Sequence, residues 1–194
     1  MTDQLTDRTR RRRHTARWVA GAMALALIAL SIVLATRPAY QATEAQSPLL
    51  GNKAPSIKGL SYEGEHISLS AFRGRFVFVN FFASWCSPCS AEEPNLVDFN
   101  FEQQESPTGA RMLSVDIDDS ASSGRNFVRQ FGAIWPTLPD KGGTIANAYG
   151  VGSPPATFLI DPDGVVVYLL VGPVEVRQLN SALATARRAF GSTQ

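Results

Sequence analysis

The chain has 194 residues, a formal net charge of +1, 44% hydrophobic residues and 18% charged residues. This length is enough to bury one sizeable core and to carry a short appendage, and the small net charge excludes an overall attraction to nucleic acid. With only two cysteines, the chain also cannot hold the multi-disulfide framework that is typical of small exported domains.

The N-terminal part of the chain divides into a basic segment and an apolar segment. Residues 1–17 are rich in arginine, and residues 18–36, WVAGAMALALIALSIVLAT, contain no charged side chain. As a helix the apolar segment is about 28 Å long, which is close to the hydrocarbon thickness of a bilayer. We therefore expect a transmembrane anchor at 18–36. By the positive-inside rule, residues 1–17 are then cytoplasmic and everything after Arg37 lies outside the cytoplasm of a bacterial cell.

Two other interpretations of this N-terminal part compete with a retained anchor. A cleaved signal peptide has a shorter apolar core that ends in small residues, and the stretch LATRPAYQA offers no clean cleavage site of that kind. The arginines could also form a nucleic-acid-binding arm or a twin-arginine export signal, but their position directly before an apolar run favours membrane orientation. We expect a retained anchor, no nucleic-acid partner, and a polar, proline-containing linker over 37–50.

Residues 51–194 alternate between strand and helix patterns and are expected to form the extracytoplasmic domain. In chain order the patterns predict strands at 66–71 and 75–83, a helix at 86–104, a strand at 111–118, helices at 120–131 and 144–149, strands at 156–161 and 165–171 joined by a DPDG turn, and a helix at 175–190. The run RFVFVNFFA is apolar on both faces, as expected of a central strand. Early alternation and a late hairpin predict an α/β fold with a mixed sheet.

Both cysteines, Cys86 and Cys89, fall at the junction between a predicted strand and a predicted helix. A bridge between them closes too small a loop to restrict the unfolded chain, so structural stapling explains them poorly. A zinc site needs about four ligands, and the other candidates are only His14, before the apolar segment, and His66. At a helix start, free backbone N–H groups and the helix dipole stabilise a thiolate at Cys86, and Cys89 lies one turn further, where a resolving thiol is needed. The pair therefore predicts redox chemistry and no metal site.

A carboxylate follows the pair at a spacing that suits proton transfer. Glu92 lies three residues after Cys89, hence on the same face of the predicted helix, where it could take the proton of Cys89. The alternative is an ordinary solvated helix carboxylate, for which the adjacent Glu93 provides an example. Spacing alone does not decide between the two.

The segment FFASWCSPCSAEEPNL resembles the active-site segment of thioredoxin-like proteins. The resemblance is closest to the membrane-anchored branch known as TlpA, ResA or DsbE/CcmG, with its pattern W-C-x-P-C-x-x-E-x-P-x-L. It extends over about residues 50–190 through LLGNKAPSIKGL, LSAFRGRFVFVNF and YGVGSPPATFLIDPDG. It implies a thioredoxin-like fold in which helices flank a mixed central sheet, with an N-terminal extension and a central insertion, preceded by one transmembrane helix.

The resemblance also implies roles for individual residues. It makes Glu92 the buried active-site acid, in place of the aspartate that plain thioredoxins carry where this chain has Asn80. Trp85 is expected to lie beside the site and shape access to it, unless it is an ordinary core tryptophan. Pro155 matches the cis-proline of the family, although the register leaves Pro154 as an alternative. In relatives the residue before that proline pairs with an extended substrate, and Pro154 has no N–H to donate.

By this resemblance the protein is expected to be a membrane-tethered thiol–disulfide oxidoreductase that acts outside the cytoplasm without a cofactor. The implied substrates are protein disulfides, in particular the CxxCH motif of apocytochrome c, and an integral-membrane thiol donor is the implied partner that keeps the protein reduced. A general oxidase or isomerase has the same residues and differs in reduction potential. A peroxiredoxin-like peroxidase and a copper-delivery protein fit less well, because no Thr-x-x-Cys motif and no histidine after residue 66 are present.

Overall fold

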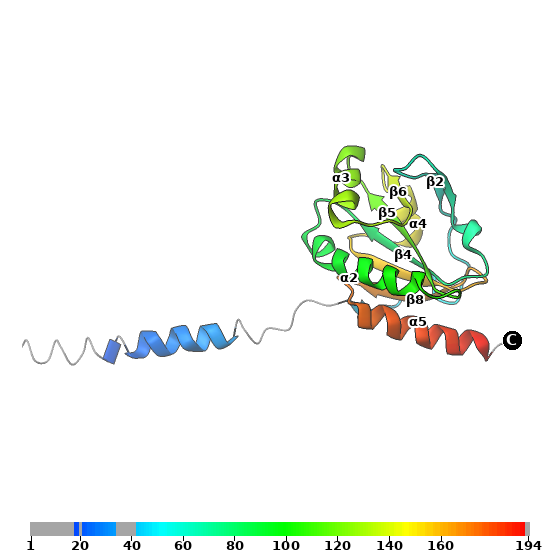
Figure 1. The fold of residues 1–194 in the computed structure, drawn as a ribbon. Coiled ribbons are helices and arrows are strands. Elements are labelled where there is room, and N and C mark those ends of the chain that lie inside the picture. Colours follow the sequence, from blue (N-terminus) through cyan, green and yellow to red (C-terminus); the bar gives the residue numbers. More distant parts are fainter. Residues whose placement is uncertain (1–17, 20, 34–41, 193–194) are drawn as a thin grey trace, which may run out of the picture. The chain divides into compact units, whose positions relative to one another are not determined.

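The computed structural model describes residues 18–19, 21–33 and 42–192 (Figure 1). The chain divides into two compact units, Met1–Ala39 and Tyr40–Gln194.

Of the first unit, the described residues are helical and their large apolar side chains are exposed. Within the described ranges, no helix combines the length and the apolar content that crossing a bilayer requires. The predicted basic segment 1–17, the end of the predicted anchor at 34–36 and the first part of the predicted linker, up to residue 41, lie outside the described residues.

The second unit is built on a six-stranded mixed sheet with the strand order β1-β8-β7-β4-β5-β6. Its strands are β1 (Thr43–Glu44), β4 (Val77–Phe82), β5 (Arg111–Ile117), β6 (Thr137–Asp140), β7 (Ala156–Ile160) and β8 (Val166–Val171). Strands β4, β5 and β6 run parallel, whereas β7 is antiparallel to both β4 and β8. The predicted central strand is thus β4, between one parallel and one antiparallel neighbour.

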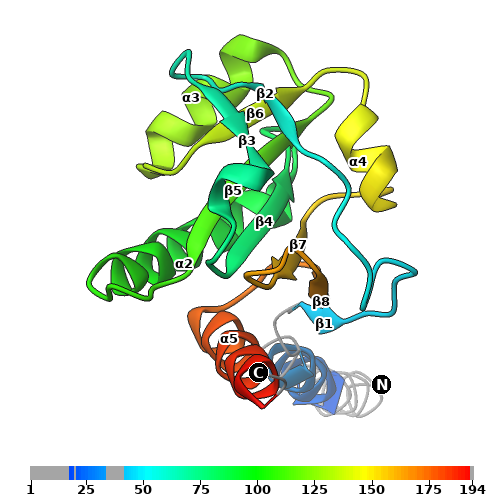
Figure 2. The same ribbon diagram turned by 90° about the vertical axis from the view of Figure 1, so that its right-hand side faces the viewer.

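Helices cover both faces of this sheet. They are α2 (Ser87–Gln104), α3 (Ala121–Phe131), α4 (Thr144–Tyr149) and α5 (Val176–Gly191), close to the bounds that the sequence predicts. Helices α2 and α5 lie on one face and α4 lies on the other (Figure 2). Helix α3 begins at the N-cap Ser120, whose side chain accepts a hydrogen bond from Ser123, and ends at Gly132, whose φ of 75° favours glycine.

Strand β4 joins the two layers because its side chains alternate between them. All six of its residues are buried. On one face Phe78 packs edge-to-face on Phe99 of α2, and on the other Phe81 contacts Tyr149 of α4, each pair with ring centroids 5.0 Å apart. Asn80 is on the same face as Phe78, so a polar side chain lies buried on the face that α2 covers.

Two strands of the sheet were not predicted from the pattern of apolar residues in the sequence. Strand β1 lies inside the predicted linker 37–50, where Thr43 pairs with Val171 at the edge of β8, so the linker interpretation is wrong from Ala42 onward. Backbone hydrogen bonds hold this strand in the sheet, so its side chains show no alternation of apolar and polar residues that would predict a strand. Strand β6 contains Pro139, which an edge strand tolerates because one row of its backbone groups needs no partner.

A small second sheet precedes the main one in the chain. Strand β2 (Lys58–Leu60) pairs with β3 (His66–Ser68), and a 3₁₀ turn, η1 (Leu69–Phe72), follows. The predicted strand 66–71 is therefore only half strand. The turn between β2 and β3 carries Tyr62, a residue that the sequence patterns leave unassigned.

Candidate active site

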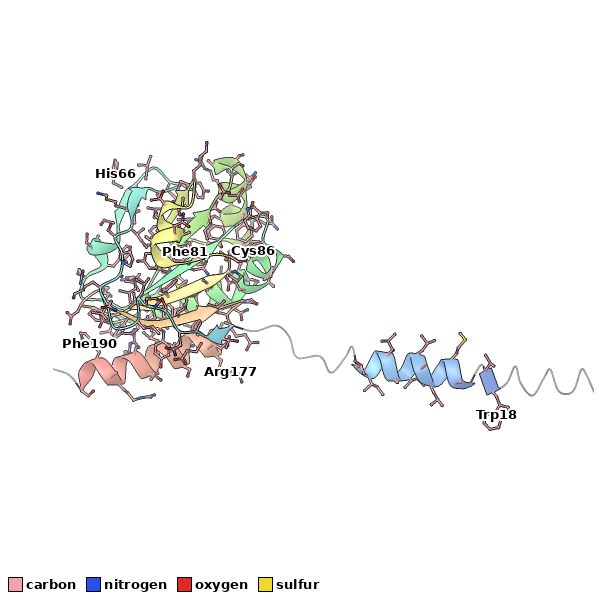
Figure 3. All side chains as sticks on the ribbon, turned by 180° about the vertical axis from the view of Figure 1, so that it is seen from behind. Trp18, His66, Phe81, Cys86, Arg177 and Phe190 are labelled. Carbon is pink, nitrogen blue, oxygen red and sulfur yellow. A yellow bond between two sulfur atoms is a disulfide. The ribbon has the colours of Figure 1, made fainter. Side chains whose placement is uncertain are left out.

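Cys86 and Cys89 form a disulfide at the start of α2. Cys86 is the N-cap of the helix, with extended backbone, and its Sγ accepts a hydrogen bond from the N–H of Cys89 at 3.1 Å. Pro88 lies in the first helical turn, where no backbone N–H is needed. The predicted junction of strand and helix thus places the cysteines as expected, and Figure 3 marks Cys86 at this end of the helix.

The helix start gives Cys86 the properties of an attacking sulfur. Free N–H groups and the positive end of the helix dipole favour a thiolate at the N-cap after the disulfide opens. Cys86 is 5% exposed, whereas Cys89 is fully buried. Cys86 is therefore both the more accessible of the two cysteines and the one whose thiolate the helix start stabilises.

Glu92 lies one turn beyond Cys89 and is fully buried. Its Oε1 accepts a hydrogen bond from Asn80 Nδ2 at 2.9 Å, and its Oε2 accepts one from the N–H of Val174 at 3.0 Å. Burial raises the pKa of Glu92 to about 8, although these two hydrogen bonds favour the ionised form. The solvated alternative is therefore wrong, and Glu92 is a buried acid that titrates near neutrality.

Asn80 connects this acid to the neighbouring strand. Its Nδ2 also donates to Thr157 Oγ1 on β7 at 3.1 Å, while its Oδ1 has no partner within the described residues. Asn80 stands where plain thioredoxins carry an aspartate, and here it holds Glu92 in place.

Glu93 does not behave as the sequence interpretation assumed. It is only 4% exposed, and burial raises its pKa to about 7. The buried stripe of α2 is wide enough to include two consecutive carboxyl groups. Cys89, Glu93 and Leu96 line one side of the stripe, and Glu92 and Phe99 line the other side. Glu93 is therefore not an example of a solvated helix carboxylate.

The proline loop lies at the same end of the sheet as the disulfide. The peptide bond between Pro154 and Pro155 is cis, which settles the register in favour of Pro155. Strand β7 starts directly after it and pairs antiparallel with β4, so Ala156 lies opposite Phe81, close to the end of β4 from which the chain runs to Cys86. Pro155 is buried and Pro154 is partly exposed. The carbonyl oxygen of Pro154 accepts a long hydrogen bond from Ser153 Oγ at 3.5 Å, and Pro154 has no N–H to donate.

Trp85 directly precedes Cys86 and is 63% exposed, so it is not a core tryptophan. Its place on the surface next to the accessible cysteine fits the expected role in shaping access. The substrate-binding roles of Trp85, Pro154 and Pro155 stay predictions.

Sequence reasoning missed a second group of polar residues next to the site. Tyr62 shares a buried cluster with Cys86 and Cys89, and its hydroxyl donates a hydrogen bond to Asp116 of β5. In the following loop, Asp119 accepts a hydrogen bond from the N–H of Ser84 at 2.8 Å. The available signal was a charged residue inside the apolar strand pattern RMLSVDID. Within the described part of the chain, no cluster of three or more histidine, cysteine or acidic residues is arranged to hold a metal ion.

Comparison with known proteins identifies the family of the chain. Residues 50–169 match the sequence profile of the AhpC/TSA family. The chain belongs to this family. It is 37% identical over 134 residues to the thiol-disulfide oxidoreductase ResA of Bacillus thuringiensis (strain Al Hakam), an alignment that covers 69% of this chain and 76% of the relative.

Two solved structures support the fold. One is described as a thiol:disulfide interchange protein DsbE from Chlorobium tepidum, with a TM-score of 0.64 and 29% identity over 71% of this chain and 96% of the other. The other is StoA from Bacillus subtilis, which at 22% identity and a TM-score of 0.58 over 67% of this chain and 97% of the other speaks for the fold alone. The predicted thioredoxin-like fold is confirmed, and this member of the AhpC/TSA family is a thiol–disulfide oxidoreductase, as predicted.

Proposed function

We propose that this oxidoreductase is tethered to the membrane by its N-terminal helix, acts outside the cytoplasm, and reduces disulfides of exported proteins, in particular the CxxCH disulfide of apocytochrome c. A reductant in an oxidising compartment drifts to its own disulfide unless it is recharged, so an integral-membrane thiol donor is part of the proposal.

The single observation that carries thiol–disulfide exchange is the buried acid one helical turn beyond Cys89, whereas the reducing direction is tested by the potential. In the dithiol form, the Cys86 thiolate attacks a sulfur of the substrate disulfide, a mixed disulfide forms, and the displaced substrate sulfur takes up a proton. Glu92 then accepts the proton of Cys89, whose sulfur attacks Cys86. The Cys86–Cys89 bond forms again, the second substrate sulfur takes the proton that Glu92 returns, and the substrate leaves with both electrons as a dithiol. A carboxyl group with a pKa of about 8 accepts and returns this proton efficiently near neutral pH.

The membrane tether is supported by the N-terminal sequence. The residues at 18–19 and 21–33 are helical and expose large apolar side chains, among them Trp18, Leu25 and Ile28. An apolar surface of that size is unfavourable in water, and insertion into a bilayer removes it from water. Arginines precede the helix, which orients the catalytic domain outward by the positive-inside rule. Fusions of alkaline phosphatase to the C-terminus should be active, and inactive fusions would refute the outward orientation.

The substrate is tested by trapping it on Cys86. A Cys89→Ser variant of the full chain lacks the resolving thiol, so substrates should accumulate as mixed disulfides in membranes of the native host. The matched control is the Cys86→Ser, Cys89→Ser double variant, which has no attacking sulfur. Cytochrome c precursors in the trap would support the proposal. A broad mixture of exported proteins would point to a general oxidoreductase, and an empty trap would count against substrate exchange.

The direction of electron flow is tested by the reduction potential. Equilibration of the purified full chain with glutathione should give a value more negative than about −200 mV, as for other thiol reductants. A clearly higher potential would indicate a general oxidase or isomerase instead.

A further inference from the structure

A tyrosine and an aspartate form a buried pair on the side of the redox site away from Glu92. Glu92 bonds toward β7 through Asn80, whereas Asp116 lies on β5, the other neighbour of β4. The Tyr62 hydroxyl donates to Asp116 Oδ2, and the two residues are 8% and 1% exposed. The chemistry proposed above for the cysteine pair and Glu92 makes no use of this second carboxyl group.

The pair adjoins the loop that carries Cys86. Asp116 is the register partner of Phe82, the last residue of β4, and the Tyr62 ring belongs to the same buried cluster as Phe82 and both cysteines. From the same side, Asp119 accepts the N–H of Ser84, two residues before Cys86. A charge on Asp116 therefore lies within the apolar surroundings of the sulfur atoms, where charges interact more strongly than in water.

The surrounding structure is shaped around this pair. Helix α3 passes it at Gly124, where any Cβ would overlap the Asp116 carboxylate and the Tyr62 hydroxyl. Asp116 Oδ1 is buried and has no hydrogen-bond partner within the described residues, so a proton or a water molecule can satisfy it. Burial raises the pKa of Asp116 to about 7, against the opposing hydrogen bond from Tyr62. Burial also raises the pKa of Tyr62, which therefore stays a donor.

We propose that Asp116 and Tyr62 form a proton-binding site coupled to the charge on Cys86, and that this coupling sets how the reduction potential of the disulfide depends on pH. Reduction by two glutathione thiols breaks the Cys86–Cys89 bond, forms one glutathione disulfide, and leaves a thiolate at Cys86 and a thiol at Cys89. The remaining proton binds Asp116 when its carboxyl group is ionised, and otherwise enters the solvent. The proposal requires only thiol–disulfide exchange, whichever substrate the protein serves.

The sign of the coupling follows from the charges. An ionised Asp116 repels a thiolate, so it disfavours the dithiol form and lowers the reduction potential, while a protonated Asp116 has no such effect. Other groups face the pair. Asp119 adds negative charge from the β5–α3 loop, and the Arg125 guanidinium of α3 lies 5.7 Å from the centre of the Tyr62 ring. Glu92 and Glu93 of α2 titrate in the same pH range on the other side of the cysteine pair, so the contribution of Asp116 is isolated by comparing variants.

The test compares Asp116→Asn with the unaltered full chain in detergent, by equilibration with glutathione at pH 5.5, 7 and 8.5. At pH 8.5 we expect the equilibrium constant to favour the dithiol by about threefold to tenfold more in the variant, the upper value corresponding to about 30 mV. At pH 5.5, where Asp116 is protonated, the two proteins should agree. Alkylation of Cys86 by iodoacetamide should reach its midpoint at a lower pH in the variant. The control Asp163→Asn removes an exposed carboxylate from the β7–β8 turn and should change none of these values.

Tyr62→Phe provides an independent second variant. It removes the donor that stabilises the Asp116 carboxylate, so the pH at which the potential responds should move upward. If Asp116→Asn does not fold, this shift alone decides the question, and its absence overturns the proposal. A difference between Asp116→Asn and the unaltered chain that is equal at pH 5.5 and 8.5, or that is absent at both, also overturns it. Failure of the unaltered chain to exchange with glutathione would refute the thiol–disulfide activity itself.

Discussion

The burial of Glu92 predicts that Glu92→Gln reverses its effect on stability between acid and alkaline pH. Burial favours the neutral form of Glu92 in the folded state. An exposed glutamate has a pKa of 4.5 and the buried Glu92 one of about 8, so between these two pH values the unfolded state has lost a proton that the folded state retains. The free energy of unfolding then falls, by at most about 5 kcal/mol at 1.36 kcal/mol per pH unit. We expect about 2–4 kcal/mol, because an ionised buried carboxylate draws in water and donors.

The glutamine variant escapes this loss but incurs a constant cost. Its amide nitrogen faces the N–H of Val174 or the Nδ2 of Asn80, which leaves a buried donor unpaired at a cost of about 1 kcal/mol. Glu92→Gln should therefore be less stable than the unaltered chain at pH 4.5 and more stable at pH 8, with a crossing near pH 6.

Urea unfolding of the disulfide form of the full chain, followed by tryptophan fluorescence at several pH values, measures this difference. Asp116 titrates in both proteins and cancels, whereas the charge of Glu93 raises the pKa of Glu92 and acts in the same direction as burial. The control Asp98→Asn changes an exposed residue of the same helix and should not reproduce the crossing of the two stability curves. A difference between Glu92→Gln and the unaltered chain that is constant from pH 4.5 to 8 would refute the argument.

Three further predictions follow from the same contacts. Glu93→Gln should stabilise the fold by about 1–2 kcal/mol more at pH 8 than at pH 5, because burial raises the pKa of Glu93 to about 7; equal changes at both pH values in urea unfolding would contradict this. Gly124→Ala should cost about 2–4 kcal/mol and lower the Tm, because its Cβ overlaps Asp116 and Tyr62, and an unchanged Tm would show that α3 yields freely. Pro154→Ala adds one backbone donor beside the site and should lower KM for a peptide disulfide by about twofold to tenfold, whereas an unchanged KM would exclude backbone docking there.

The sequence predicted the parts of the site that depend on local order. The strand β4 ends where its apolar run ends, so Cys86 at a helix start follows from neighbouring residues alone. The burial of Glu92 is different, because Glu93 beside it is equally acidic, and only the contacts of α2 with Asn80 and Val174 give Glu92 its hydrogen bonds.

The pair of Tyr62 and Asp116 was beyond any local pattern. Its members are 54 residues apart in the chain, and they meet because the turn after β2 lies over the end of β5. The edge strands β1 and β6 were missed for another reason. Backbone hydrogen bonds hold these two strands in the sheet. The residues of the two strands, Thr43–Glu44 and TLPD, do not alternate between apolar and polar side chains, so no strand was predicted there.

The unequal exposure of the two cysteines limits the route that electrons can take. With Cys89 fully buried and Cys86 slightly exposed, one sulfur atom must serve both the protein that supplies electrons and the protein that receives them. The two cannot occupy it together, so turnover proceeds by strict alternation. An excess of either protein should slow the other, and double-reciprocal plots at several donor concentrations should give parallel lines.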